Sequence, residues 1–515
     1  MEKFPWWNEA QKALADEVDA FSDEITPKVQ ELVWKREFPW EIIREVGKRG
    51  WFGAVIPEEY GGKKSEWGYT GCCIILEYLS RAGVSVACPY LLTMCGGTHQ
   101  IEDFSPPEKK EEWLPKIAKG ELLGAVGLTE PYVGSDAASV ETVARREGDE
   151  YVITGKKRFI TSGLAADIYV VYARTSDDPK DIAKYRHITA FIVERGREGF
   201  HVEKVNELIG FDNLYNAYLD LDEVRVPVEN RLGEEGEGWR VMMSGLNFER
   251  TMAAASMLGV MREALRYAVF HSERRIQFGQ PTINIGVNQF KIADMVWIFN
   301  TARLLTYYTA YVLDLGGTAA AEAATAKMFT TDFGMKMFLD AVQVMGGDGV
   351  TRFYPVESYI RDTKILQIAA GTNEIMKLLI FNQGLRALRK YIPPPVRKVH
   401  PELRVPITVA FGSLRDEEKK KVESEEDVLK ALAENYKVNP GLAMTLDDMK
   451  GVLAADDETL IKMLTALEEK KLVKTFKDRK GRIKLARITL EGLRKTLTLE
   501  ECKWIPSWVL EKDIF

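Results

Sequence analysis

The chain has 515 residues, which is too long for one ordinary hydrophobic core and predicts two to four domains. Hydrophobic residues make up 46% and charged residues 29% of it, a balance typical of globular proteins rather than disordered or membrane-spanning ones. The formal net charge of −7 argues against nucleic-acid binding as the main activity, although it leaves room for one local basic patch.

The first 120 residues carry apolar side chains at three- and four-residue spacing, which predicts an N-terminal helical domain. Residues 121–232 contain short runs rich in β-branched and aromatic residues between turns, and these predict antiparallel strands of a barrel or sandwich. The helical period returns over residues 233–390 and predicts a helical bundle. The expected fold class is therefore mainly α with a central β domain.

The last part of the chain reads as a separate module. Prolines in residues 391–405 predict a linker. Over residues 406–515, three helical stretches precede a hairpin with its turn near Arg479 and Gly481, an order that predicts a winged-helix-like extension. The hairpin is rich in Lys and Arg, but acidic residues precede it. A contact within an oligomer, a lid over the bundle or docking of a partner is therefore favoured over DNA binding.

The termini and the cysteines favour a cytoplasmic protein. The N-terminal residues show no apolar run followed by a small-residue cleavage site, and no stretch approaches the roughly 20 apolar residues that a spanning helix needs. The cysteines, Cys72, Cys73, Cys88, Cys95 and Cys502, have no spacing typical of a zinc site or a disulfide framework. We expect buried reduced thiols, no metal site and no integral membrane segment.

Four segments could carry chemistry: GLTEPYVGSDAAS (127–139), KKRFITSGLAAD (156–167), RRIQFGQPTINIGVNQFKIADM (274–295) and the glycine-rich stretch 340–377. Alone, each has an ordinary interpretation as a turn, a strand, a solvated helix end or a helix break. Functionally, small residues let backbone amides approach a phosphate, and Phe159 could stack on a flat ring whose nitrogen Thr161 could hydrogen-bond. An arginine beside a diphosphate and a break at Gly346 and Gly347 fit a ligand equally well.

Together and in this order, the four segments resemble the acyl-CoA dehydrogenase family, whose usual patterns are LTEPxxGSD, (W/F)IT, RxxFGxP…ADM and QxxGGxG…RD…GT. The resemblance runs from near the N-terminus to about Arg389. It implies a helical domain, a β domain and a four-helix bundle, assembled as a homotetramer of paired dimers. It also implies FAD as cofactor, an acyl-CoA substrate and an electron-transfer flavoprotein as the partner that reoxidises the flavin.

The resemblance implies particular ligand contacts. The implied FAD contacts are Leu128, Thr129, Gly134, Ser135, Phe159, Ile160, Thr161, Arg275, Phe278, Gln343, Gly346, Gly347, Thr372 and Glu374. Those of the first two segments would meet the flavin and its phosphates. Those between 275 and 347 would reach the FAD of a neighbouring subunit, and the last two would close over the adenosine-diphosphate side. The implied substrate contacts are Ser135, Asn247, Arg250 and Gly371.

The catalytic base departs from the commonest family pattern. Most members place a glutamate directly before the GT of the fourth segment, where this chain has Ala370. Isovaleryl-CoA and long-chain type enzymes instead carry it on a bundle helix beside an arginine, and LNFERTMAAA places Glu249 beside Arg250. Its helical neighbours are uncharged, which should raise its pKa. Glu249 is the implied base, and the Ala370 N–H would polarise the thioester carbonyl. The alternative is a glutamate buried for packing.

Other readings remain open. The same fold could act as an acyl-CoA oxidase or an enoyl-CoA reductase. A DNA-associated flavoprotein could use the dehydrogenase body as a scaffold, although Glu249 argues against it. Tyr132 and Val133 stand where the family usually has Gly-Ala, a departure that could reshape the cofactor or acyl pocket.

Overall fold

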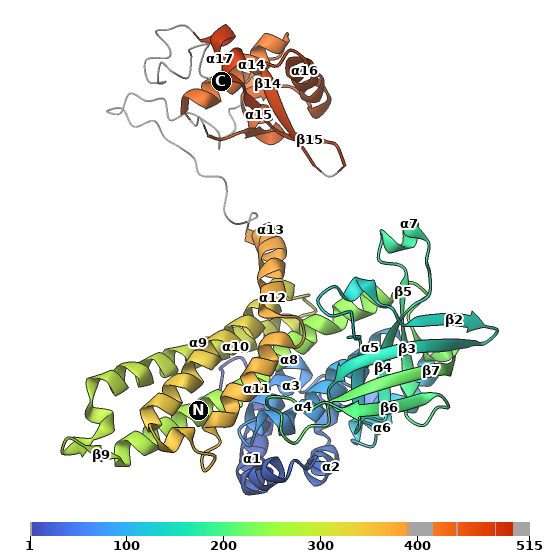
Figure 1. Cartoon of the computed structure of the whole chain (residues 1–515), viewed down its shortest axis with the longest axis vertical. Helices are drawn as coiled ribbons and strands as arrows, with labels where there is room; N and C mark the ends of the chain where they lie inside the picture. The colour runs from blue at the N-terminus through green and yellow to red at the C-terminus, as the bar shows by residue number, and fades with distance from the viewer. Residues whose placement is uncertain (1–2, 389–390, 392–415, 439–440, 479, 498–515) are drawn as a thin grey trace. The chain divides into compact units, whose positions relative to one another are not determined.

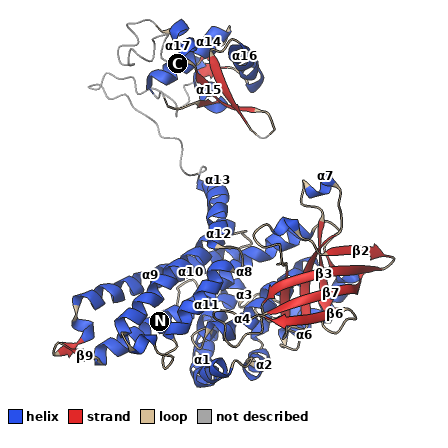
Figure 2. Cartoon of the chain, viewed as in Figure 1, coloured by secondary structure: helices blue, strands red, loops and turns tan. Residues whose placement is uncertain are grey.

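The structure is a computed structural model that describes residues 3–388, 391, 416–438, 441–478 and 480–497 (Figure 1). The chain divides into two compact units, Met1–Ala387 and Leu388–Phe515. In the first unit, most strands gather at one end, a short hairpin lies at the opposite end, and helices form most of the rest (Figure 2). Within the described ranges, no helix combines the length and apolar character needed to cross a membrane.

The N-terminal part is helical, as predicted. Its α-helices are α1 (Glu9–Lys35), α2 (Trp40–Lys48), α3 (Gly68–Leu79), α4 (Val84–Thr93), α5 (His99–Phe104) and α6 (Pro107–Ala118). Helix α1 begins with a capping box, in which the Asn8 side chain accepts from the Gln11 N–H and the Gln11 side chain accepts from the Asn8 N–H. Four predicted free thiols, Cys72, Cys73, Cys88 and Cys95, are buried here, and Cys502 lies outside the described residues.

The middle part forms one eight-stranded sheet. Its strands are β1 (Gly124–Gly127), β2 (Val143–Glu147), β3 (Glu150–Ile160), β4 (Ile168–Arg174), β5 (Ile188–Glu194), β6 (Phe200–Val205), β7 (Ala217–Pro227) and β8 (Arg231–Leu232). The order is β6-β7-β3-β2-β4-β5-β8, with β1 beside β4. The expectation of antiparallel pairing is wrong at two places, because β4 pairs in parallel with β1 and with β2. Strands β4 and β5 are almost completely buried and read as continuous apolar runs, which carry no sign of strand direction.

The third part is the predicted helical bundle. Its helices are α8 (Gly238–Arg274), α9 (Gly286–Asp314), α10 (Ala320–Met345), α11 (Val356–Ile368), α12 (Asn373–Leu379) and α13 (Leu385–Leu388). A small hairpin of β9 (Ile276–Gln277) and β10 (Gln280–Pro281) joins α8 to α9. Helix α10 ends at Gly346, whose φ of 61° suits a glycine, so the predicted helix break is confirmed.

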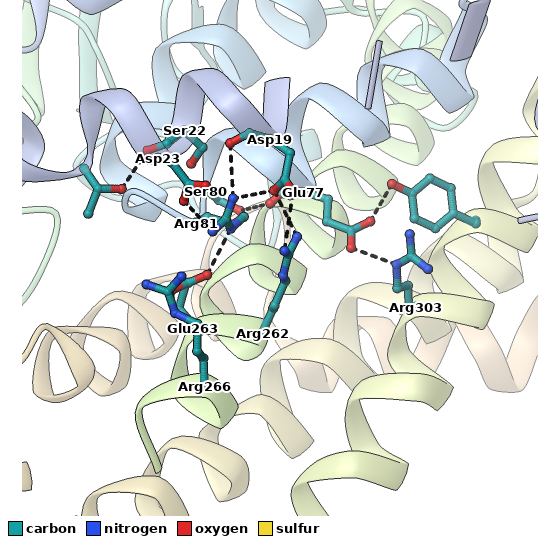
Figure 3. Close-up of polar contacts among 12 residues, drawn as sticks. Asp19, Ser22, Asp23, Glu77, Ser80, Arg81, Arg262, Glu263, Arg266 and Arg303 are labelled. Atoms are coloured by element: carbon teal, nitrogen blue, oxygen red, sulfur yellow. Dashed lines mark hydrogen bonds and ion pairs between the residues drawn. The ribbon is translucent and has the colours of Figure 1, made fainter. Parts of the chain in front are cut away.

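A network of ion pairs ties the N-terminal helices to the bundle (Figure 3). Glu77 of α3 is fully buried and accepts from Arg303 Nε at 2.7 Å and from the Tyr307 hydroxyl at 2.6 Å, both on α9. Arg81 bonds to Glu263 of α8 at 2.9 Å and also pairs with α1. Because buried charges need such partners, the network sets how α8 lies against α1, α3 and α9.

The second unit has a core of its own. Its described elements are α14 (Glu425–Val438), α15 (Leu446–Val452), α16 (Asp457–Glu469), α17 (Leu490–Thr496), and the strands β11 (Lys420–Lys421), β12 (Met444–Thr445), β13 (Leu453–Ala454), β14 (Val473–Lys477) and β15 (Ile483–Ile488). Strands β12, β15 and β14 form an antiparallel sheet. Strand β14 ends at Lys477 and β15 begins at Ile483, so the turn predicted near Arg479 and Gly481 falls between them, although Arg479 itself lies outside the described residues. Residues 392–405 of the expected linker lie outside the described residues.

Candidate active site

Glu249 lies on α8, where its charge acts on Cys95 of the N-terminal part and on Tyr172 of the sheet. Its neighbours on the helix, Gly245, Met252 and Ala253, are buried. Burial raises the pKa of the Glu249 carboxyl above its usual value, while the nearby charges of Arg250 and Lys327 oppose the rise. Burial is also the main cause of a raised pKa at Tyr172 of β4, and the Glu249 charge adds to it. The predicted direction of the Glu249 shift is confirmed.

Arg250 connects this acid to the loop between α11 and α12. Its Nε donates to the Ala370 carbonyl at 3.3 Å, and its Nη1 donates to Asn247 Oδ1 at 3.3 Å. Asn247 Nδ2 in turn donates to the Thr318 carbonyl at 3.1 Å. The structure therefore brings the predicted residues 247, 249, 250 and 370 together.

The loop itself has an unusual backbone. Ala370 and the following Gly371 have φ values of 55° and 90°, so two successive residues occupy the left-handed region. In the part of the chain that the structure describes, the Ala370 N–H donates to no protein acceptor. Thr372 ends the loop as the N-cap of α12, where its hydroxyl accepts from the Ile375 N–H at 3.4 Å. Glu374, the second residue of that helix, is exposed.

The sequence analysis missed Lys327, which lies beneath this loop. Its side chain on α10 is fully buried, and its Nζ donates to the Gly371 carbonyl at 2.9 Å, to Asn373 Oδ1 at 2.9 Å and to the Gln367 carbonyl at 3.2 Å. Burial lowers the pKa of Lys327 to about 7, helped by the Arg250 charge. A lone lysine in the apolar run AAEAATAKMF was the signal that could have drawn attention to it.

The first two motif segments meet through a buried ion pair, which the sequence analysis also missed. Lys157 of β3 is fully buried, and its Nζ donates to Glu130 Oε1 at 2.6 Å and to the Tyr172 carbonyl at 2.7 Å. Glu130 also accepts the N–H groups of residues 141 and 142. Next to this pair, the Arg158 N–H donates to the Thr129 carbonyl at 2.7 Å. The two segments are therefore held side by side.

The predicted residues of these segments differ in exposure, and several of them are open to solvent. Phe159 has a φ of 59° and is 47% exposed, which is unusual for a large aromatic side chain. Ser135 is exposed, and a Cβ added to Gly134 would touch nothing within 4 Å. Thr161 Oγ1 accepts from Asn216 Nδ2 at 3.2 Å, whereas Leu128 is half-buried and Ile160 packs into the β-domain core. Tyr132 points outward at 88% exposure and Val133 is buried.

A third group of predicted residues lies at the other end of the bundle. Arg275 and Phe278 belong to the α8–α9 connection, and Phe278 is 93% exposed. Gln343, Gly346 and Gly347 are exposed at the end of α10. His271 of α8 contacts Asp348 at 2.7 Å and so links the two segments. Within one chain this group lies far from the sheet (Figure 1), so a single chain does not bring all the predicted cofactor contacts together.

Sequence comparison identifies three consecutive matches to one family. They are described as the acyl-CoA dehydrogenase N-terminal domain over residues 8–121, the middle domain over 125–224 and the C-terminal domain over 236–385. All three matches end before the second unit begins.

Individual relatives agree with these matches. An acyl-CoA dehydrogenase of Bacillus subtilis is 39% identical over 359 residues, which cover 69% of this chain and 93% of that protein. A mitochondrial isovaleryl-CoA dehydrogenase of Pongo abelii is 34% identical over 376 residues, covering 72% and 88%. The solved structure of butyryl-CoA dehydrogenase from Megasphaera elsdenii matches with a TM-score of 0.71 and 35% identity, covering 76% of this chain and 100% of that one.

Proposed function

Because the chain belongs to the acyl-CoA dehydrogenase family, whose members are FAD-dependent oxidoreductases, we propose that Glu249 is the base in an α,β-dehydrogenation of an acyl-CoA thioester. The observation that carries this proposal is the environment of the Glu249 carboxyl. Burial raises its pKa, and its neighbour Arg250 holds the loop at Ala370. A carboxylate with a raised pKa is a stronger base than an ordinary carboxylate, so it removes a weakly acidic proton more effectively.

The residues of the first two motif segments fit a flavin. An exposed aromatic ring at Phe159 offers a flat apolar surface, and the open space beside Gly134 leaves room for close approach of a ligand to the backbone. Ser162 Oγ is buried and, among the described residues, has no hydrogen-bond partner. Ser162 and Phe159 lie in one short segment, so this segment carries both a hydroxyl without a partner and an exposed ring, which suits a polar, planar ligand. Leu128, Thr129, Ser135, Ile160 and Thr161 complete the proposed contacts.

The proton and the electron pair leave the substrate in different directions. Glu249 takes the proton from the α carbon, and the electrons of that C–H bond form the new α,β double bond. The hydrogen on the β carbon leaves with its bonding electrons, and a bound FAD would supply the acceptor for it. The Ala370 N–H, which has no acceptor in the described part of the chain, donates to the thioester carbonyl and stabilises its developing negative charge. Ser135, Asn247, Arg250 and Gly371 contribute to substrate binding.

The third residue group supports a proposed homotetramer of paired dimers. In that assembly Arg275, Phe278, Gln343, Gly346 and Gly347 would reach the FAD of a neighbouring subunit, while Thr372 and Glu374 close over the adenosine-diphosphate side. Large apolar residues along α9 support it too, because a monomer rarely exposes so many on one helix. They are Phe290, Trp297, Leu304, Tyr308 and Tyr311. We also propose an electron-transfer flavoprotein as the partner that reoxidises the flavin, and a winged-helix-like fold for the second unit.

The proposal is tested by anaerobic flavin bleaching with a panel of acyl-CoA thioesters. Wild type should bleach with one class of thioester, while Glu249→Gln should retain the yellow flavin and bleach at least about a hundredfold more slowly. Glu273→Gln is the matched control, since this exposed glutamate lies near the far end of the same helix and pairs only with the adjacent Arg274. Equal bleaching of wild type and Glu249→Gln would show that another group is the base.

A further inference from the structure

Lys327 is a buried cation without a carboxylate partner. Its exposed fraction is 0%, and the described residues offer it no Asp or Glu oxygen within 4.0 Å. Three neutral oxygens solvate its Nζ instead, those of Gln367, Gly371 and Asn373. A buried ammonium group is costly to fold, so its three bonds to one short segment mark that segment as the place where it acts.

The three acceptors belong to three successive parts of the chain. The Gln367 carbonyl is one of the last in α11, which lack partners within the helix. The Gly371 carbonyl lies in the loop, and Asn373 is the first residue of α12. Asn373 Nδ2 in turn donates to Thr331 Oγ1 at 2.9 Å and to Asp332 Oδ1 at 2.6 Å. Lys327 and its neighbours on α10 therefore clamp the whole α11–α12 connection.

This clamp fixes a backbone that would not hold its shape alone. The left-handed conformation is unfavourable for an alanine, and Ala370 adopts it directly before Gly371. Arg250 holds the Ala370 carbonyl and Lys327 holds the Gly371 carbonyl. Lys327 also holds the Gln367 carbonyl, so the restrained carbonyls lie on both sides of the Ala370 N–H in the sequence, and this short stretch limits the direction in which that N–H points.

We infer that Lys327 is a positioning residue, which orients the Ala370 N–H toward the thioester carbonyl by holding the Gly371 carbonyl and Asn373 in place. The inference rests on the proposed function, because it assumes that this N–H is the donor used in catalysis. Lys327 has no place in the set of predicted site residues, and it acts through the loop without touching the reacting atoms.

The same side chain also acts on the base through its charge. Lys327 and Arg250 both favour the charged form of Glu249 against the effect of burial. The charged groups that face Lys327 are Arg250 and Glu249 from α8, Asp332 from α10 and Glu374 from α12. Removing the ammonium group therefore raises the pKa of Glu249, and the low-pH side of the rate profile moves to higher pH.

The experiment compares Lys327→Met with Lys336→Met. Lys336 lies on the same helix with an exposed head paired to Asp294 and Asp340, and it has no contact with the loop. In anaerobic bleaching with the thioester class that wild type oxidises, Lys327→Met should keep its flavin and its half-saturating substrate concentration. Its limiting rate should fall roughly tenfold to a hundredfold, because a displaced donor loses most of its effect. The control should match wild type.

A second readout needs no turnover. In the Glu249→Gln background, difference infrared spectra should show the bound thioester carbonyl stretch below its value in solution, and Lys327→Met should return it toward that value. If Lys327→Met is not recovered folded, Lys327→Gln keeps an N–H donor without the charge and should give an intermediate rate and stretch. A flavin-containing Lys327 variant with wild-type rate, pH profile and stretch would overturn the inference. Failure of the proposed function would look different. In that case wild type would bleach with no thioester, or Glu249→Gln would bleach as fast as wild type.

Discussion

The first unit contains two fully buried lysines that hold motif loops in place, and they do so in different ways. Lys157 binds the first motif through a carboxylate, Glu130, at 2.6 Å. Lys327 binds the fourth motif through neutral oxygens alone, with its shortest bonds at 2.9 Å. Burial lowers the pKa of both, to about 8 for Lys157 and to about 7 for Lys327, and the Glu130 charge opposes the shift at Lys157.

The two lysines show that a buried cation can act mainly on the stability of the fold or mainly on the reaction. The Lys157–Glu130 pair is nearly neutral as a whole, so its charge has little effect beyond the two loops it joins. The Lys327 charge is not cancelled by a direct partner, and its field reaches Glu249 and Arg250. We therefore expect Lys157 to matter mostly for stability and Lys327 mostly for the reaction.

The largest expected effect on stability comes from removing Lys157 from its ion pair with Glu130. Lys157→Met leaves the Glu130 carboxylate buried without its partner and should lower the free energy of unfolding by about 3–5 kcal/mol. Lys327→Met leaves only neutral acceptors and should lower it by about 1–3 kcal/mol. Urea unfolding followed by tryptophan fluorescence measures both. Equal losses in the two variants would contradict the distinction between a charge pair and a solvated single charge.

The next effect is the pH dependence of stability. The folded-state pKa of Lys327 is about 7, below the usual value of 10.5, so the unfolded chain binds more protons between these two pH values. The contribution of this lysine to stability is therefore present above the unfolded pKa and is lost as pH falls toward 7.

From pH 7.5 to 9, the unfolding free energy of wild type should rise relative to that of Lys327→Met by about 1–2 kcal/mol. Urea unfolding at a series of pH values measures this difference. The contributions of titrating groups that both proteins share cancel when one free energy is subtracted from the other. A difference that stays constant over this range would mean that Lys327 has the same ordinary pKa in the folded and the unfolded protein.

The order of elements and much of the site could be predicted from the sequence, because both depend on local patterns. Helical periodicity marks α8 and α10, and the LNFER and AAGT segments point to Glu249 and Ala370. The contact between residues 250 and 370 agrees with the reading of these segments as parts of one site.

What could not be predicted depends on contacts between distant segments. Lys327 meets a loop that begins more than 40 residues later, and no local pattern shows which face of α10 the loop covers. Glu130 and Lys157 belong to different motifs, so no local pattern in either motif shows that the two side chains form an ion pair. The parallel pairing of β4 with β1 and β2 was missed for the same reason, since a buried strand shows no direction in its composition.

The smallest stability effect is expected at the loop that Lys327 holds. Ala370→Gly removes the unfavourable left-handed alanine but gives the unfolded chain more freedom, so the two contributions oppose each other and should leave a change under about 1 kcal/mol. A glycine pair at 370 and 371 is less restrained, so the N–H is less well oriented and the limiting bleaching rate should fall by a few fold. Thermal unfolding and anaerobic stopped-flow bleaching measure the two effects. A wild-type rate in Ala370→Gly would mean that Arg250 and Lys327 alone fix the loop, which would strengthen the role of the clamp relative to that of the alanine itself.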